Sequence, residues 1–198
     1  MFNIDNDRMS VCTCFGNGEY EKGRKKLFVM YNTKLKKLTN IEDIRFIIHN
    51  LAWVEYYLKN TESARRYITE IKTIFEKNDN YIKNYPSDYC KILDLYNISH
   101  TDIISVDEKI DLYKKTYAIF CQTNSPDRYM ALHNIYDLKK QYDKIPNLLR
   151  EMLTNIGEHQ NFVSEFLKDL QENDEDSYKE SLLIVEEFKL SNTSMTSL

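Results

Sequence analysis

The sequence predicts an all-α protein in which about four to five antiparallel helical hairpins stack as an α-solenoid. Apolar residues recur at helical spacing along almost the whole chain of 198 residues, without strict alternation of apolar and polar residues. Only 4 glycines and 3 prolines are present, too few for the many tight turns of an all-β protein. Because 42% of the residues are hydrophobic and 13% are aromatic, the chain can bury a packed core.

Breaks in the apolar pattern divide the chain into helices. We expect them at about residues 3–15, 19–38, 41–58, 61–77, 86–98, 106–122, 126–139, 142–156, 158–171 and 175–189. In the first half, Asn40 can cap the helix that begins at residue 41, because its side chain can accept a bond from a free N–H. Asn60 or Thr61 can cap the next helix in the same way. Pro86 suits a first helical turn, where its missing N–H is not needed.

The helices of the second half have similar signals. Ser105 and Glu108 form a possible capping box for the helix that follows. Pro126, after a serine, marks another helix start, and Gly157 suits the left-handed position after a helix end. Pro146 lies four or five residues inside its expected helix, so it either shortens or kinks that helix.

The chain reads as one array over residues 1–190. No linker rich in Gly, Pro or Ser divides it, and the small polar residues 191–198 predict a disordered tail. The first residues lack the basic-then-apolar order of a secretory signal, and no segment approaches the roughly 20 apolar residues of a membrane span. We therefore expect a cytoplasmic protein that does not enter a membrane.

Residues 50–71 contain the clearest internal repeat. Leu51 and Ala52 form a large–small pair in the first helix, and Ala64 is the small residue where the second helix crosses it. Ile68 and Ile71 fill the two apolar sites that follow. Residues 132–152 match in Leu132, Tyr136, Tyr142, Leu149 and Met152, and residues 16–30 match in Gly18, Tyr20, Gly23, Leu27 and Met30. These residues resemble the tetratricopeptide repeat (TPR). Each hairpin of such an array covers the apolar face of its neighbour.

The resemblance implies a right-handed superhelix whose first helices line a concave face. In repeat style and in its tyrosine-, lysine- and asparagine-rich composition, the chain is similar to the TPR arrays of the Rap, NprR, PlcR, PrgX and arbitrium-type receptors. Those arrays hold short signalling peptides on this face. Many of these receptors have an N-terminal helix-turn-helix domain, for which this chain has no room before residue 16. The resemblance thus implies a non-catalytic peptide- or protein-binding regulator or adaptor.

Candidate contacts for a peptide or protein lie on the first helices of two hairpins. Asparagine can both donate to and accept from an extended peptide backbone, and tyrosine adds contact area with a polar tip. The candidates are Asn50, Glu55, Tyr57, Tyr129, Asn134 and Asp137. For Trp53, on the same helix as the first three, we expect packing between hairpins.

Two alternatives use charge or apolar surface. The basic helix 22–37 could contact phosphates in a nucleic-acid-associated regulator, through Lys25, Lys26, Lys36 and Lys37. The C-terminal helices are acidic, so the opposite signs of the two ends could support head-to-tail or antiparallel self-association. Exposed apolar faces of the end helices could also pair in a structural homodimer.

Enzyme and cofactor signals are missing from the sequence. It has no HExxH, no glycine-rich phosphate loop and no GxSxG. The spacing of Cys12, Cys14, Cys90 and Cys121 matches no zinc ribbon or CxxC motif, which is typical of reduced thiols in a cytosolic protein. We expect no catalysis, no metal and no cofactor.

Overall fold

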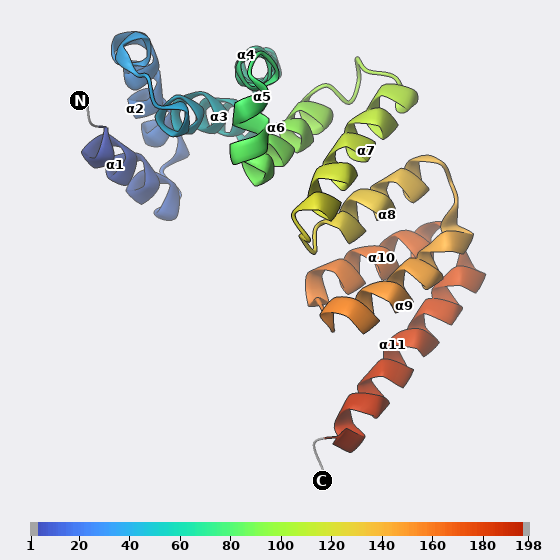
Figure 1. Cartoon of the computed structure of the whole chain (residues 1–198). Coiled ribbons are helices and arrows are strands. Elements are labelled where there is room, and N and C mark those ends of the chain that lie inside the picture. The colour runs from blue at the N-terminus through green and yellow to red at the C-terminus, as the bar shows by residue number, and fades with distance from the viewer. Residues whose placement is uncertain (1–3, 196–198) are drawn as a thin grey trace. The chain divides into compact units, whose positions relative to one another are not determined.

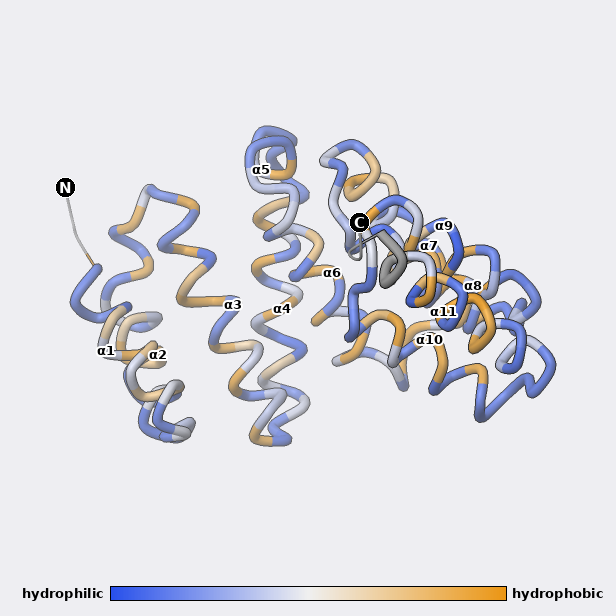
Figure 2. Tube along the Cα trace, turned by 90° about the horizontal axis from the view of Figure 1, so that it is seen from below, coloured by the Kyte–Doolittle hydropathy of each residue, from blue (hydrophilic) through white to orange (hydrophobic). Residues whose placement is uncertain are grey.

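The computed structural model describes residues 4–195, with side chains as far as Ser191, and this part of the chain contains helices and no strand. It confirms the all-α prediction. The chain forms two compact units, Met1–Ser105 and Val106–Leu198 (Figure 1). Along each helix, hydrophobic and hydrophilic positions alternate at short intervals (Figure 2), as expected for helices that bury one face.

The first unit is built from helices that pack on their neighbours in the chain. Its helices are α1 (Asp5–Gly16), α2 (Tyr20–Thr33), α3 (Ile41–Tyr57), α4 (Thr61–Glu76), α5 (Asp79–Asn84) and α6 (Pro86–Ser99), with a 3₁₀ turn at Leu35–Lys37. Contacts run from α1 to α2, α2 to α3, α3 to α4 and α4 to α6. The first unit is therefore a solenoid of stacked hairpins.

The second unit packs less regularly. Its helices are α7 (Val106–Gln122), α8 (Arg128–Leu138), α9 (Ile145–Ile156), α10 (Gln160–Asn173) and α11 (Glu175–Met195), with a 3₁₀ turn at Tyr142–Lys144. Helices α7 and α8 form a hairpin, while α11 packs on both α9 and α10. The core of this unit includes the buried residues Leu149, Met152, Phe166 and Leu170.

The same turn closes four of the helices. Residues with positive φ follow α1, α3, α7 and α8, at Gly18 (φ 72°), Lys59 (65°), Asn124 (52°) and Lys140 (53°). At each site two backbone N–H groups bond back into the last helical turn, as in Gly18 N to Phe15 O (3.0 Å) and Glu19 N to Cys14 O (2.8 Å). This is the Schellman arrangement. The recurring turn is a structural repeat that the residue types alone conceal, because glycine occupies only one of the four sites.

Several predicted signals act as expected. Asn40 caps α3 by accepting a bond from Glu42 N at 3.0 Å. Gly157 has φ 76° after α9, and Pro86 is in the first turn of α6. Pro146 shortens its helix, since α9 begins at Ile145 with the proline in its first turn.

Other boundaries differ from the prediction. The expected helix 19–38 is wrong at its end, because α2 stops at Thr33. Asn32 and Thr33 bond through their side chains to the carbonyls of Phe28 and Val29, at 2.8 and 2.7 Å, and such bonds compete with regular helix. The short helix α5, capped by Asn78, was not predicted.

Asn60 occupies the position before α4, but it does not cap that helix. Its Nδ2 instead donates to Glu55 Oε2 at 2.7 Å. Helix α11 extends to Met195, into the segment 191–198 that the sequence assigns to a tail, and residues 196–198 lie outside the described residues. The single domain over 1–190 stays a prediction.

Two further features concern membrane spans and disulfides. None of the helices in the described part of the chain combines the length and the apolar character needed to cross a membrane. The four cysteines form no disulfide with one another.

Candidate ligand-binding surface

Four aromatic side chains gather where α1, α2 and α3 meet, and we call them the aromatic surface. They are Phe15 at the end of α1, Tyr20 at the start of α2, and Trp53 and Tyr57 on α3. Phe15, Tyr20 and Trp53 are partly buried, whereas Tyr57 is 50% exposed. Aromatic rings that are packed on one side and open on the other suit contact with a partner.

The rings support one another closely. Trp53 and Tyr57 stack at 5.6 Å between ring centroids with 18° between the planes, as their spacing of four residues on a helix allows. Tyr20 lies 4.2 Å from Tyr57 and 5.8 Å from Trp53, and Phe15 meets Trp53 edge-on at 5.5 Å. The nearby Tyr57 raises the pKa of Tyr20, so the Tyr20 phenol stays protonated at neutral pH. The surface is thus neutral and preorganised.

A glycine on α2 makes room for this arrangement. A Cβ atom added to Gly23 would lie 2.4 Å from Phe15 Cε1 and 2.8 Å from Cδ1. Any larger residue at this position would therefore displace the Phe15 ring. The close approach of Phe15 thus explains why a glycine occupies the middle of a helix, where glycine otherwise lowers stability.

The predicted contacts on α3 separate into two kinds. Asn50, Trp53 and Tyr57 are spaced by three and four residues and share one stripe of the helix. Asn50 is half-buried and its Nδ2 donates to Phe46 O at 2.6 Å. Glu55 is only 5% exposed, and its carboxylate accepts from Asn60 and pairs with Arg24 at 3.4 Å. Glu55 thus joins α2, α3 and the turn before α4, and its contact with a ligand stays a prediction.

In the second unit, Tyr129 is also engaged internally. It is 2% exposed, its hydroxyl accepts from Asn155 Nδ2 at 2.9 Å, and the Arg128 guanidinium lies 4.7 Å from its ring centre. These contacts give Tyr129 a packing role within the second unit. Its contact with a ligand stays a prediction.

Asn134 and Asp137 lie at a polar junction between α8 and α10. Tyr142 Oη donates to Asp137 Oδ1 at 3.3 Å, and the buried His133 places Nε2 at 3.4 Å from Asp169 Oδ2. Burial lowers the pKa of His133, so the imidazole is neutral at pH 7. Burial and the neighbouring carboxylates, Asp137 foremost, raise the pKa of Asp169. This junction is acidic and half-buried, and it includes two of the predicted contacts.

The structure does not gather the predicted phosphate-contacting lysines on one helix. Lys25 and Lys26 lie on α2, but Lys36 and Lys37 fall in the 3₁₀ turn after it. Much of the basic charge is also paired locally: Lys22 bonds to Glu19 at 2.9 Å and Arg24 to Glu21 at 3.1 Å. The continuous basic helix 22–37 is therefore a wrong expectation.

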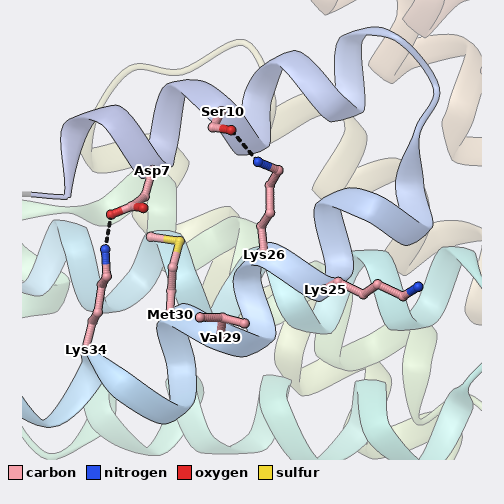
Figure 3. A pocket seen from close by; sticks show the side chains of 7 residues that line it. All are labelled: Asp7, Ser10, Lys25, Lys26, Val29, Met30 and Lys34. Carbon is pink, nitrogen blue, oxygen red and sulfur yellow. Dashed lines mark hydrogen bonds and ion pairs between the residues drawn. The ribbon is translucent and has the colours of Figure 1, made fainter.

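A pocket of about 300 Å³ lies between α1 and α2 (Figure 3). Its lining residues are Asp7, Ser10, Lys25, Lys26, Val29, Met30 and Lys34. Lys26 Nζ donates to Ser10 Oγ at 2.6 Å, and Lys34 pairs with Asp7. The volume is at the small end for ligand pockets, so it suits a side chain better than a cofactor.

Among the side chains that the structure describes, residues 4–191, no group of three or more His, Cys, Asp or Glu has the geometry to hold a metal ion.

Sequence reasoning missed two members of the aromatic surface, Phe15 and Tyr20. They are separated by only four residues, Gly16–Glu19, and end up beside each other because that segment is a tight helix–helix turn. The glycines of this segment were the signal that could have found them.

Comparison with known proteins places the fold. No family model and no curated protein sequence matches this chain. Among solved structures, it is similar to TPR-like repeats of a Podosopora anserina putative kinesin light chain, with a TM-score of 0.70, 16% identity and 96% of each chain covered. It is similar to the apo form of RapI, with a TM-score of 0.70 and 14% identity over 96% of this chain and 70% of that one.

A third similar structure is BtubC (BKLC) from P. vanneervenii, with a TM-score of 0.63 and 10% identity over 95% of this chain and 79% of that one. These likenesses show the fold: the chain is an all-α, TPR-like helical-repeat protein. The resemblance drawn from residues 50–71 is thereby confirmed at the level of architecture.

Proposed function

We propose that this protein is a non-catalytic regulator or adaptor that binds a peptide or protein segment on the aromatic surface of its first unit. TPR-like repeats are scaffolds for protein interaction, and RapI shares its name with the Rap receptors that the sequence resembles. The observation that carries the proposal is Tyr57, an exposed aromatic ring held in place by Tyr20 and Trp53. Asn50 lies on the same stripe of α3 and would bond to the backbone of the bound segment.

The chemistry of the surface suggests how binding works. Its rings are already fixed against one another. A ligand that stacks on Tyr57 and Trp53 therefore binds with little entropy cost for ordering these side chains. Contact residues of this type supply much of the binding energy at protein interfaces. In the second unit, Asn134 and Asp137 at the polar junction would offer a separate set of contacts. The site of action would be the cytoplasm.

Selection from a random peptide display library tests the proposal, with the full-length protein as bait. Enriched peptides should bind the Tyr57→Ala variant about 10- to 100-fold more weakly, the range for losing one aromatic anchor. The matched control is Phe28→Ala on α2, since Phe28 is 49% exposed but belongs to no ring cluster. Failure to enrich any peptide, or equal affinity for Tyr57→Ala and wild type, would overturn the proposal.

A further inference from the structure

Helix α11 presents an exposed face in which leucines flank glutamates. Leu183, Glu186, Glu187 and Leu190 are spaced by three, four and seven residues, so they lie on one stripe of the helix. Leu183 is 59% exposed and Leu190 is 72% exposed. Glu186 and Glu187 are exposed and have no ion-pair partner among the residues that the structure describes. We call these four residues the α11 stripe.

The outer side of α2 has the opposite character. Val29 is 57% exposed at the rim of the α1–α2 pocket, and Met30 forms part of its wall (Figure 3). Lys25 is exposed beside them and forms no ion pair within the described part of the chain. Lys25, Lys26 and Lys34 line the pocket with a single acidic residue, Asp7, which pairs with Lys34. An apolar hollow is thus bordered by positive charge.

We propose that the α1–α2 pocket of one copy of this chain binds the α11 stripe of a second copy. A leucine of the stripe would enter the hollow over Val29 and Met30, while Glu186 and Glu187 approach Lys25 and Lys26. Apolar contact at the centre with charges at the rim is the usual anatomy of a protein interface. The charge complementarity selects this occupant: α11 has five acidic residues and two basic ones between Glu175 and Leu190.

The contact joins two different faces, so it is heterologous. After the first contact one copy still offers its pocket and the other its stripe to a further copy, and association therefore continues into chains or a ring. One helix on one shallow pocket buries less than a standard interface, so we expect a weak, reversible contact. Screening should weaken it further as salt rises.

Sedimentation velocity of the full chain tests the proposal. Between about 5 and 500 μM protein at 50 mM salt, the average mass should rise with concentration, and 500 mM salt should largely abolish the rise. Lys25→Glu and Glu187→Lys should each weaken self-association at least about tenfold, because each places like charges opposite one another. Circular dichroism should show unchanged helix in both variants.

Mixing the two variants distinguishes this geometry from other forms of association. The Lys25→Glu copy keeps an intact stripe and the Glu187→Lys copy keeps an intact pocket. Their mixture should therefore associate more strongly than either variant alone, because intact faces can meet and the two reversed faces also have opposite charges. Lys36→Glu and Glu151→Lys, matched charge reversals on exposed residues outside both faces, should associate as wild type does.

Two results would overturn the proposal. One is a monomer at every concentration, which would mean that the stripe is covered within its own chain or serves another protein. The other is a mixture of the two variants that associates no more strongly than either variant alone.

Discussion

At the scale of single residues, His49 ties the stability of the first unit to pH. Burial, followed by the nearby Arg45 charge, lowers the pKa of His49 from 6.5 to about 4. His49 therefore becomes protonated below about pH 6.5 in the unfolded chain, but only below about pH 4 in the folded chain. Stability that is fully present above pH 6.5 is thus lost as the pH falls toward 4, by up to about 3 kcal/mol.

Urea unfolding of His49→Gln across pH 4–7 measures this effect. Glutamine cannot be charged, so the variant should lose less stability than wild type between pH 6.5 and 4. His159→Gln, at an exposed histidine of the second unit, should follow the wild-type curve. Parallel curves for wild type and His49→Gln would contradict the assignment.

The turn after α8 has a backbone conformation that its side chain does not favour. Lys140 is exposed with φ 53°, in the left-handed region where a non-glycine residue costs about 1–2 kcal/mol. Glycine removes this cost but gives the unfolded chain more freedom, so Lys140→Gly should raise stability by about 0.5–1 kcal/mol. Lys139→Gly at φ −89° should lower it instead. Chemical denaturation checks both signs, and a loss of stability in Lys140→Gly would refute the argument.

At the scale of helices, the fit between α1 and α2 controls the aromatic surface. Gly23→Ala improves helix propensity by about 1 kcal/mol but forces its Cβ against the Phe15 ring. Phe15 must then move away from Trp53, so we expect a changed Trp53 emission spectrum with little net change in stability. Gly16→Ala meets no atom within 4 Å and should leave the spectrum unchanged. An unaltered spectrum in Gly23→Ala would show that Phe15 does not depend on this gap.

Helix positions were predictable because the apolar period and caps such as Asn40 are local signals. The end of α2 was not, because Asn32 and Thr33 could sit in a helix and only the structure shows their bonds to Phe28 and Val29. The hairpin turns at Lys59 and Lys140 could not be predicted for a similar reason, because lysine has no preference for a positive φ.

The candidate site was predictable only in part. Tyr57 and Asn50 followed from helix spacing, and the structure leaves Tyr57 exposed. The engagement of Glu55 by Arg24 and Asn60 depends on contacts between elements, 31 residues apart in the first case, which no local pattern reveals. Pairings of this length are set by the stacking of hairpins.

At the scale of the whole molecule, the TPR-like fold explains why the candidate binding residues collect on hairpin faces. Each hairpin packs against its neighbours with one side, and its other sides remain available for partners. In the first unit the available side includes a neutral aromatic surface, and the outer side of α2 is basic. These two surfaces differ in chemistry, and so do the partners proposed for them: a peptide for the first and an acidic helix for the second.

The most direct test of the proposed binding function uses Trp53, the only tryptophan of the chain. Its indole lies within the aromatic surface, so its emission reports on contact there without any label. On titration with a selected peptide or a co-purified partner, we predict a saturable change in Trp53 emission and protection from acrylamide quenching. A ligand that binds by calorimetry while Trp53 emission and quenching stay unchanged would contradict the account.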